Sequence, residues 1–198
     1  ARKPAVLVLE DGSVFEGFSL GKIGVATGEI CYNTGMTGYQ EIYTDPSYFG
    51  QIIINTSSHI GNYGTVEDEQ ESSSPQISGV IINEYSEIYS RSNSDESLED
   101  YFIKNNTVAI YDIDTRKLVK YIRDKGAMNA IISSESQDVE KLKSSLDKVP
   151  SMKNLELSSK VTTEKEYEFG DKNSKIKIAV LDLGCKQSIL KNFSERGA

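Results

Sequence analysis

GEICYNTGMTGYQEIYTDPSYFGQ, which spans Gly28 to Gln51, sets glycines and hydroxyl side chains between short apolar segments. A plain core strand would not need turn-forming residues at this density. Gly28, Gly35 and Gly38 can take a positive φ without a Cβ clash, and Asp45-Pro46 favours a turn. The pattern therefore predicts a shaped loop that holds another group in place.

Short β-type segments lie on both sides of this loop. The apolar run Ala5–Leu9, followed by Asp11-Gly12 and Val14-Phe15, predicts an antiparallel hairpin. Further strands, each bounded by turn residues, are expected at Ile30–Tyr32, Gln51–Asn55 and Ile77–Ile82. The first half of the chain should therefore be mainly sheet.

Helices are expected in the second half. Asp114 is a suitable N-cap for a helix that runs to about Lys125, and Gly126 stands where helices often end in the left-handed conformation. The other predicted elements are helices at Ser97–Asn105 and Asp138–Leu146 and strands at Val108–Tyr111 and Asn129–Ser133. Helices that alternate with strands after an antiparallel start predict a layered α/β domain over residues 1–150.

The composition changes after this domain. Residues 151–174 are rich in Lys, Glu, Ser and Thr, which predicts a linker. Residues 175–198 then predict one βα unit, with a strand at Ile176–Leu181 and a helix at Gln187–Arg196. A crossover normally leads to a second parallel strand of the same sheet. We therefore expect residues 175–198 to be the start of a truncated second domain.

Composition and charge exclude several classes of protein. The 198 residues are 37% hydrophobic and 26% charged, which is typical of a globular protein. No apolar run approaches the roughly 20 residues that span a bilayer, and a net charge of −8 argues against nucleic acid as a partner. Only two cysteines occur, which fits reduced thiols and a cytoplasmic location.

Three motifs together carry a resemblance to a known family. They closely resemble the amino-terminal half of the glutamine-hydrolysing small subunit of carbamoyl phosphate synthase. The motifs are residues 28–51, HIGNYG at 59–64 and DIDTRKLVKYIRDKGAMNAII at 112–132. The resemblance implies a three-layer β/β/α domain of the swivelling type, followed by a class I glutamine amidotransferase domain. The sequence departs from the common pattern at Gly35 and at Ser57-Ser58, which affects the shape of the loops.

The resemblance also implies an activity. In that family the small subunit hydrolyses glutamine, and the ammonia passes to a large subunit that uses ATP and bicarbonate to make carbamoyl phosphate for arginine and pyrimidine synthesis. L-Glutamine and the large subunit are then the partners, and ATP and Mg²⁺ belong to the large subunit, with no cofactor in this chain. The nucleophilic Cys and its His and Glu partners would lie beyond these residues, so no catalytic residue is expected here and the 198-residue chain should be inactive.

Ser47 is the one site residue that we predict. The resemblance implies that the serine of the Asp45-Pro46-Ser47-Tyr48 turn lies at the domain boundary and contributes to the glutamine site. A hydroxyl or backbone N–H on a turn fixed by proline can bind a polar group of a ligand without acting as a nucleophile. From the residues alone, an ordinary turn serine would be the simpler interpretation.

The thiols and the single histidine leave other chemistry open. Cys185 follows a predicted strand and stands beside Lys186, a setting that can lower a thiol pKa, whereas Cys31 lies in an apolar strand typical of an inert core residue. His59 is predicted to organise its loop or a subunit contact, and no spaced ligand cluster accompanies it, so no metal site is expected. A Cys/His hydrolase and a stand-alone, non-catalytic interaction module remain alternatives.

Three further patterns favour structural roles. GKIGVATG at 21–28 lacks the Gly-Lys-Ser/Thr ending of a phosphate loop and predicts a turn between strands. Asp112 and Asp114 beside Arg116 suggest capping and an ion pair rather than acid–base catalysis. The acidic stretch Glu67–Glu71, with Ser72–Ser74, predicts a solvated loop.

Overall fold

The amino-terminal hairpin is confirmed. A computed structural model describes residues 2–198. In it β1 (Pro4–Leu9) pairs antiparallel with β2 (Val14–Gly21), and Val8 lies opposite Val14. Gly12 takes a φ of 89° in the connecting turn, a conformation that costs little without a Cβ. The predicted Asp-Gly turn therefore forms where the sequence places it.

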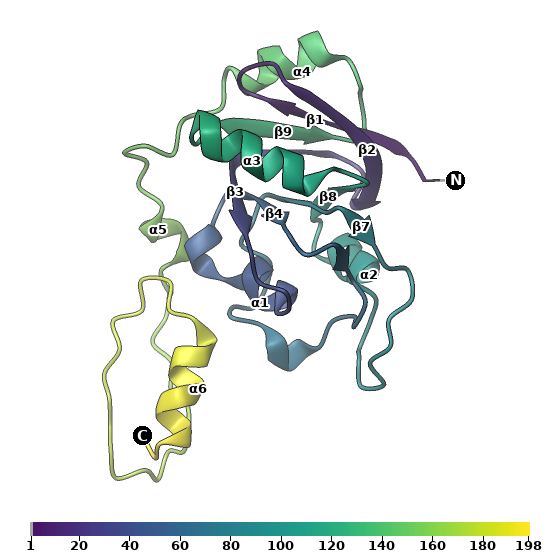
Figure 1. Ribbon diagram of the computed structural model, residues 1–198. Coiled ribbons are helices and arrows are strands. Elements are labelled where there is room, and N and C mark those ends of the chain that lie inside the picture. Colours follow the sequence, from purple (N-terminus) through teal and green to yellow (C-terminus); the bar gives the residue numbers. More distant parts are fainter. Residues whose placement is uncertain (1) are drawn as a thin grey trace.

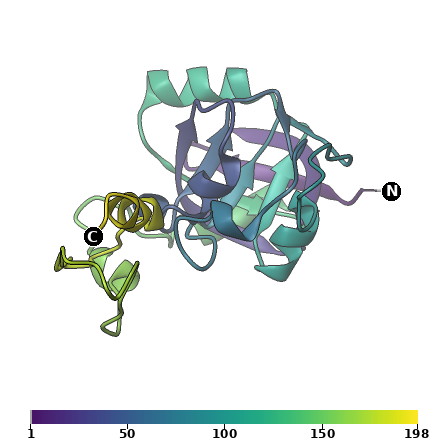
Figure 2. The ribbon, with the colours of Figure 1, turned by 90° about the horizontal axis from the view of Figure 1, so that it is seen from below.

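Seven strands close into a barrel (Figures 1 and 2). Their order around it is β1-β2-β8-β6-β4-β3-β9, and β9 returns to β1 with Leu7 opposite Ile132. The pairs β3–β4, β4–β6 and β6–β8 are parallel, and the other pairs are antiparallel. The remaining barrel strands are β3 (Val25–Asn33), β4 (Ile52–Asn55), β6 (Gly79–Ile81), β8 (Val108–Tyr111) and β9 (Asn129–Ser133). A separate parallel pair joins β5 (His59–Ile60) to β7 (Glu84–Tyr85).

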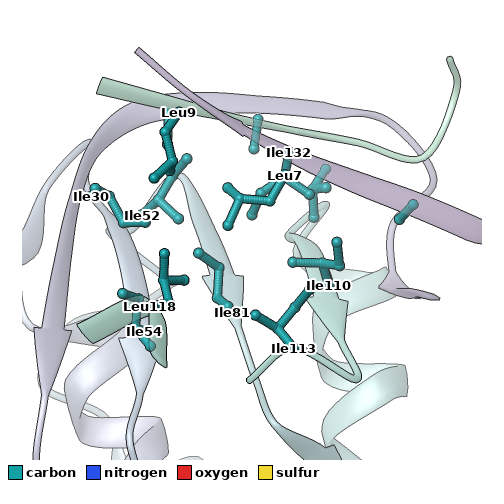
Figure 3. Packing of buried hydrophobic residues seen from close by; sticks show 14 of the residues in the cluster. Leu7, Leu9, Ile30, Ile52, Ile54, Ile81, Ile110, Ile113, Leu118 and Ile132 are labelled. Atoms are coloured by element: carbon teal, nitrogen blue, oxygen red, sulfur yellow. The ribbon is translucent and has the colours of Figure 1, made fainter. Parts of the chain in front are cut away.

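The alternation of side chains along each strand builds one core inside the barrel and two outside it. Leu7 and Leu9 point inward, while Val6 and Val8 pack on the outer face against α4 (Val139–Leu146). In Figure 3 the labelled inward side chains gather between the strands, with Leu118 beside Ile54. Burial of both faces explains why β1, β4 and β6 are apolar along almost their whole length, whereas β2 has one exposed face.

The helices begin where the sequence supplies caps. The side chains of Ser97, Asp114 and Asp138 each accept a backbone N–H of the helix that follows. These helices are α2 (Leu98–Lys104), α3 (Thr115–Lys125) and α4. Leu118 and Ile122 of α3 join the interior cluster, while α2 and α1 (Tyr39–Thr44) cover the outer face of the parallel strands.

The mixed α/β class is confirmed, and most of the predicted elements form. The backbone hydrogen bonds join the barrel strands into one closed sheet, in which a parallel wall faces an antiparallel one. The helix after Asp114 ends at Gly126 as predicted, but with φ 98° and ψ 178°, outside the left-handed helical region. A turn separates β2 from β3, as expected for GKIGVATG.

The prediction of a loop over residues 28–51 is wrong in part. Its centre forms α1 and the 3-10 turn Pro46–Tyr48, and among its three predicted turn glycines only Gly38 has a positive φ, of 80°. Gly28 instead lies inside β3, where a Cβ would come within 2.3 Å of the Gly50 carbonyl oxygen. Gly28 is therefore needed for close approach of two backbones rather than for a turn.

The predicted strand at Ile176–Leu181 does not form. Residues 176–181 are exposed and form no regular secondary structure, because no neighbouring strand supplies the hydrogen bonds that a sheet requires. The helix that follows does form, as α6 (Gln187–Glu195), and the linker contains one short helix, α5 (Ser158–Val161). In both ribbon views residues 151–198 lie to one side of the barrel. No helix within residues 2–198 has the length and apolar character to cross a bilayer.

Candidate functional site

Ser47 lies on a rigid turn directly after α1. Asp45 ends that helix, and its Oδ1 accepts the Ser47 N–H at 2.9 Å, which fixes the start of the Pro46–Tyr48 turn. The Ser47 side chain is exposed, and no other group within residues 2–198 forms a hydrogen bond with its hydroxyl. The turn therefore presents a free hydroxyl on a fixed backbone, which is what a ligand-binding serine requires.

The turn is attached to the end of β3. The Asn33 Nδ2 group donates to the Tyr48 hydroxyl at 3.0 Å, and Asn33 Oδ1 accepts the Gly35 N–H at 2.7 Å. Beyond the turn, Gly50 passes against Gly28 of β3. These contacts leave the Ser47 backbone little freedom to move relative to the barrel.

An ion pair connects the turn to the carboxyl-terminal segment. Lys186 Nζ lies 2.5 Å from Asp45 Oδ2, and the Asp45 side chain is only 8% exposed. The hydrogen bond to Asp45 raises the pKa of Lys186 above its ordinary value, so this lysine stays charged at neutral pH. Gly184, with a φ of 105°, passes against Pro46 at a point where a Cβ would lie 3.4 Å from that ring. The structure thus brings residues 184–186 against the Ser47 turn.

The two thiols lack the environment of a nucleophile. Burial raises the pKa of Cys31 to about 12. Burial and the nearby carboxylates of Asp182 and Glu71 raise the pKa of Cys185, contrary to the lowering that Lys186 could have produced. Neither thiol is activated, so the Cys/His hydrolase gains no support from this geometry.

His59 lies on β5 and faces a carboxylate. Its Nδ1 is 3.2 Å from Glu84 Oε2, and both side chains are more than half exposed. No cysteine of residues 2–198 forms a hydrogen bond with it, and no group of three or more potential metal ligands occurs in the same part of the chain. The predicted role of His59 as an organiser of its loop stays a prediction.

The predicted capping role of the Asp112-Ile113-Asp114 segment is confirmed, but its predicted ion pair is not. Asp114 caps α3 by accepting the Lys117 N–H at 2.9 Å. Across residues 2–198, however, the predicted ion pair with Arg116 does not occur. Asp112 takes a φ of 65° between β8 and α3, so it is not part of an extended segment.

The acidic stretch is not the solvated loop that its composition predicts. Glu67–Glu69 form a short 3-10 helix, and Glu69 pairs with Arg91 at 2.6 Å. Glu71 is half-buried and contacts the carboxyl-terminal segment. The charges therefore hold other parts of the chain rather than facing only water.

Sequence reasoning missed Tyr63 of the HIGNYG motif. Its hydroxyl accepts the N–H groups of Gly38 and Tyr39 at 2.7 and 3.2 Å, and its ring stacks on Tyr39 with centroids 4.2 Å apart. It thereby caps α1, whose own N-cap residue, Gly38, has no side chain to do so. No local signal could have shown this contact, because the partners are 24 and 25 residues apart.

Comparison with known families identifies the family to which the sequence belongs. The model of the family described as "Carbamoyl-phosphate synthase small chain, CPSase domain" matches residues 7–132. The chain belongs to this family. The matched region begins and ends at Leu7 and Ile132, the pair opposite each other in the strands that close the barrel.

Relatives in this family match nearly the whole chain. The carbamoyl phosphate synthase small chain of Synechococcus sp. is 41% identical over 99% of this chain and 53% of its own length. That of Aquifex aeolicus is 43% identical over 100% of this chain and 56% of its own length. The chain thus spans about half the length of the curated relatives that it matches.

Among solved structures, an aminopeptidase from Aneurinibacillus sp. strain AM-1 aligns at a TM-score of 0.38 and 17% identity, over 67% of this chain and 31% of that one. A likeness at that level carries no argument about fold or function. The family assignment depends on the sequence matches alone.

Proposed function

We propose that this chain works as part of the glutamine-hydrolysing small subunit of a carbamoyl phosphate synthase, in the cytoplasm. That subunit would supply ammonia from L-glutamine to a large subunit, which makes carbamoyl phosphate from ATP and bicarbonate. Family membership supports the proposal, and it does not favour a stand-alone interaction module. The observation that carries the site assignment is the free Ser47 hydroxyl on a turn held against residues 184–186.

In this proposal Ser47 binds glutamine and performs no covalent chemistry. Its hydroxyl can donate one hydrogen bond and accept others, which suits the polar groups of an amino acid substrate. The Asp45 carboxylate keeps the Ser47 backbone in place from one side and holds Lys186 on the other. The substrate would then bind at the junction between the barrel domain and the segment that leads into α6.

The wider organisation follows from the same proposal. Residues 1–150 would be the amino-terminal domain of the family, 151–174 the linker and 175–198 the start of a class I amidotransferase domain. The β/β/α layers of the family would correspond to three parts of this structure. These are the antiparallel wall of the barrel, its parallel wall and the helices over the parallel side. The amino-terminal domain would also dock the large subunit, to which ATP and Mg²⁺ belong.

The catalytic Cys, His and Glu would lie outside these residues. Both thiols within them have a raised pKa. We therefore expect no glutamine hydrolysis by the 198-residue chain itself.

The test replaces Ser47 in the small chain assembled with its large subunit. Ser47→Ala should raise the KM for glutamine about tenfold, the effect of one lost hydrogen bond of about 1.4 kcal/mol. Synthesis from added ammonia should stay unchanged, because ammonia bypasses the glutamine site. Steady-state kinetics with each nitrogen source would measure both effects.

Ser73→Ala is the matched control, because Ser73 is also an exposed serine and its hydroxyl forms no hydrogen bond within residues 2–198. An unchanged glutamine KM in Ser47→Ala would contradict the proposed site. Equal losses with glutamine and with ammonia would indicate damage to the fold instead.

A further inference from the structure

The segment Glu67–Ser72 is hydrogen-bonded on one side to the end of α1, from which the Ser47 turn starts, and on the other side to α6. On the barrel side, the Glu71 N–H donates to Thr44 Oγ1 at 2.8 Å, and the Ser72 hydroxyl donates to the Thr44 carbonyl oxygen at 2.6 Å. Thr44 is the last residue of α1 and stands three positions before Ser47. The segment is therefore attached to the helix end from which the Ser47 turn starts.

On the other side, Glu71 caps α6. The Glu71 carbonyl oxygen accepts the Gln187 N–H at 3.0 Å, and Glu71 Oε2 accepts the Ser188 N–H at 2.9 Å. The helix needs these partners, because its own N-cap residue, Lys186, makes no side-chain cap. A carboxylate at this position also interacts favourably with the positive end of the helix dipole. Glu71 thus supplies, from 117 residues away, the cap that the local sequence lacks.

The segment also contacts α6 one turn beyond its start, and a further ion pair holds the residue just before the helix. Lys191 Nζ, one turn into the helix, donates to the Asp68 carbonyl oxygen at 2.7 Å. Lys186, just before the helix, is attracted by both Asp45 and Glu71. A shift of Glu71 would consequently move the start of α6 relative to the Ser47 turn.

We infer that Glu71 is a positioning residue that sets the spacing between the Ser47 hydroxyl and the segment that leads into α6. The inference rests on the proposed function, in which glutamine binds at that junction. Binding and reaction in such a site depend on groups held to within about 1 Å. Glu71 touches no substrate in this scheme and acts only through the two backbones that it joins.

The test uses Glu71→Ala, which removes the cap, and Glu71→Gln, whose amide oxygen can still accept the Ser188 N–H. Glu67→Ala is the matched control, since Glu67 is an exposed glutamate of the same segment that does not contact α6. The first readout is hydrogen exchange of the amides of residues 187–196 in the 198-residue chain. It should become about tenfold faster in Glu71→Ala, as expected for a lost helix cap, and stay unchanged in Glu67→Ala.

The second readout is the KM for glutamine in the assembled enzyme. Glu71→Ala should raise it about tenfold with unchanged ammonia-dependent synthesis, and Glu71→Gln should recover most of the loss. Combined with Ser47→Ala, the Glu71→Ala change should add little, because both act on the same contact with glutamine. A purely structural role would instead give additive effects.

The outcomes separate this inference from the proposed function. If Ser47→Ala raises the KM and Glu71→Ala does not, the positioning role is wrong while the glutamine site stands. If Ser47→Ala itself has no effect, the proposed site fails, and the positioning role fails with it. Unchanged hydrogen exchange in α6 of Glu71→Ala would overturn the cap independently of any activity.

Discussion

Gly28 shows how one missing Cβ shapes the region around Ser47. Its backbone lies so close to Gly50 that an added Cβ would come within 2.3 Å of that carbonyl oxygen. Gly28→Ala should therefore lower the free energy of unfolding by about 1 to 3 kcal/mol, the usual cost of overpacking. Urea denaturation would measure the change.

Gly24→Ala is the appropriate control for that substitution. Gly24 also lacks a positive φ, but a Cβ there would meet its nearest neighbour, Val108, at an ordinary 3.4 Å. Equal stability losses in the two variants would contradict the close-approach explanation.

Cys31 gives a pH-dependent prediction. Its pKa of about 12 in the folded protein exceeds the value of about 8.5 for a free thiol. The resulting stabilisation is fully present below about pH 8.5 and is lost as the pH rises toward 12, because the unfolded chain then loses the proton first. At pH 8 alkylation of Cys31 should be slow until urea unfolds the chain, and mass spectrometry would follow it. Rapid alkylation in the folded protein would revive the Cys/His hydrolase.

At the scale of elements, α3 is fixed by its apolar face. Leu118 is fully buried in the barrel interior. Leu118→Ala should destabilise the protein by about 2 to 5 kcal/mol, through lost burial and the cavity that remains. Lys120→Ala, on the exposed face of the same helix, should change stability by no more than about 0.5 kcal/mol. Thermal and urea unfolding of the two variants would reveal whether α3 contributes to the core.

The helices and strands also show which local sequence signals are sufficient to predict an element. The helices after Ser97, Asp114 and Asp138 could be predicted because their caps are encoded in the adjacent sequence. The short helix α1 could not, since its cap is the distant Tyr63. The predicted strand at Ile176–Leu181 is absent because a strand, unlike a helix, needs a partner for its backbone groups.

For the whole molecule, the sequence predicted most of the strands and the β1–β2 hairpin, but not how the other strands pair. The β2–β8 ladder joins residues such as Phe18 and Tyr111, and no local pattern indicates such a partner. The same limit applies to the site. The family motif predicted Ser47, whereas the contacts of Lys186 and Glu71 arise only when distant segments meet. Composition alone suggested that the acidic stretch is solvated, because it cannot show which backbone groups a carboxylate will reach.

The pairing of β1 with β9 also bears on how the protein is made. As the chain leaves the ribosome, β1 can pair with β2 within about twenty residues. The other edge of β1 has no partner until β9, which ends at Ser133, has been synthesised. During that interval the free edge of the apolar strand β1 is open to association with other nascent chains. A premature stop codon ahead of β9 would make this exposure permanent, so such products should aggregate rather than fold.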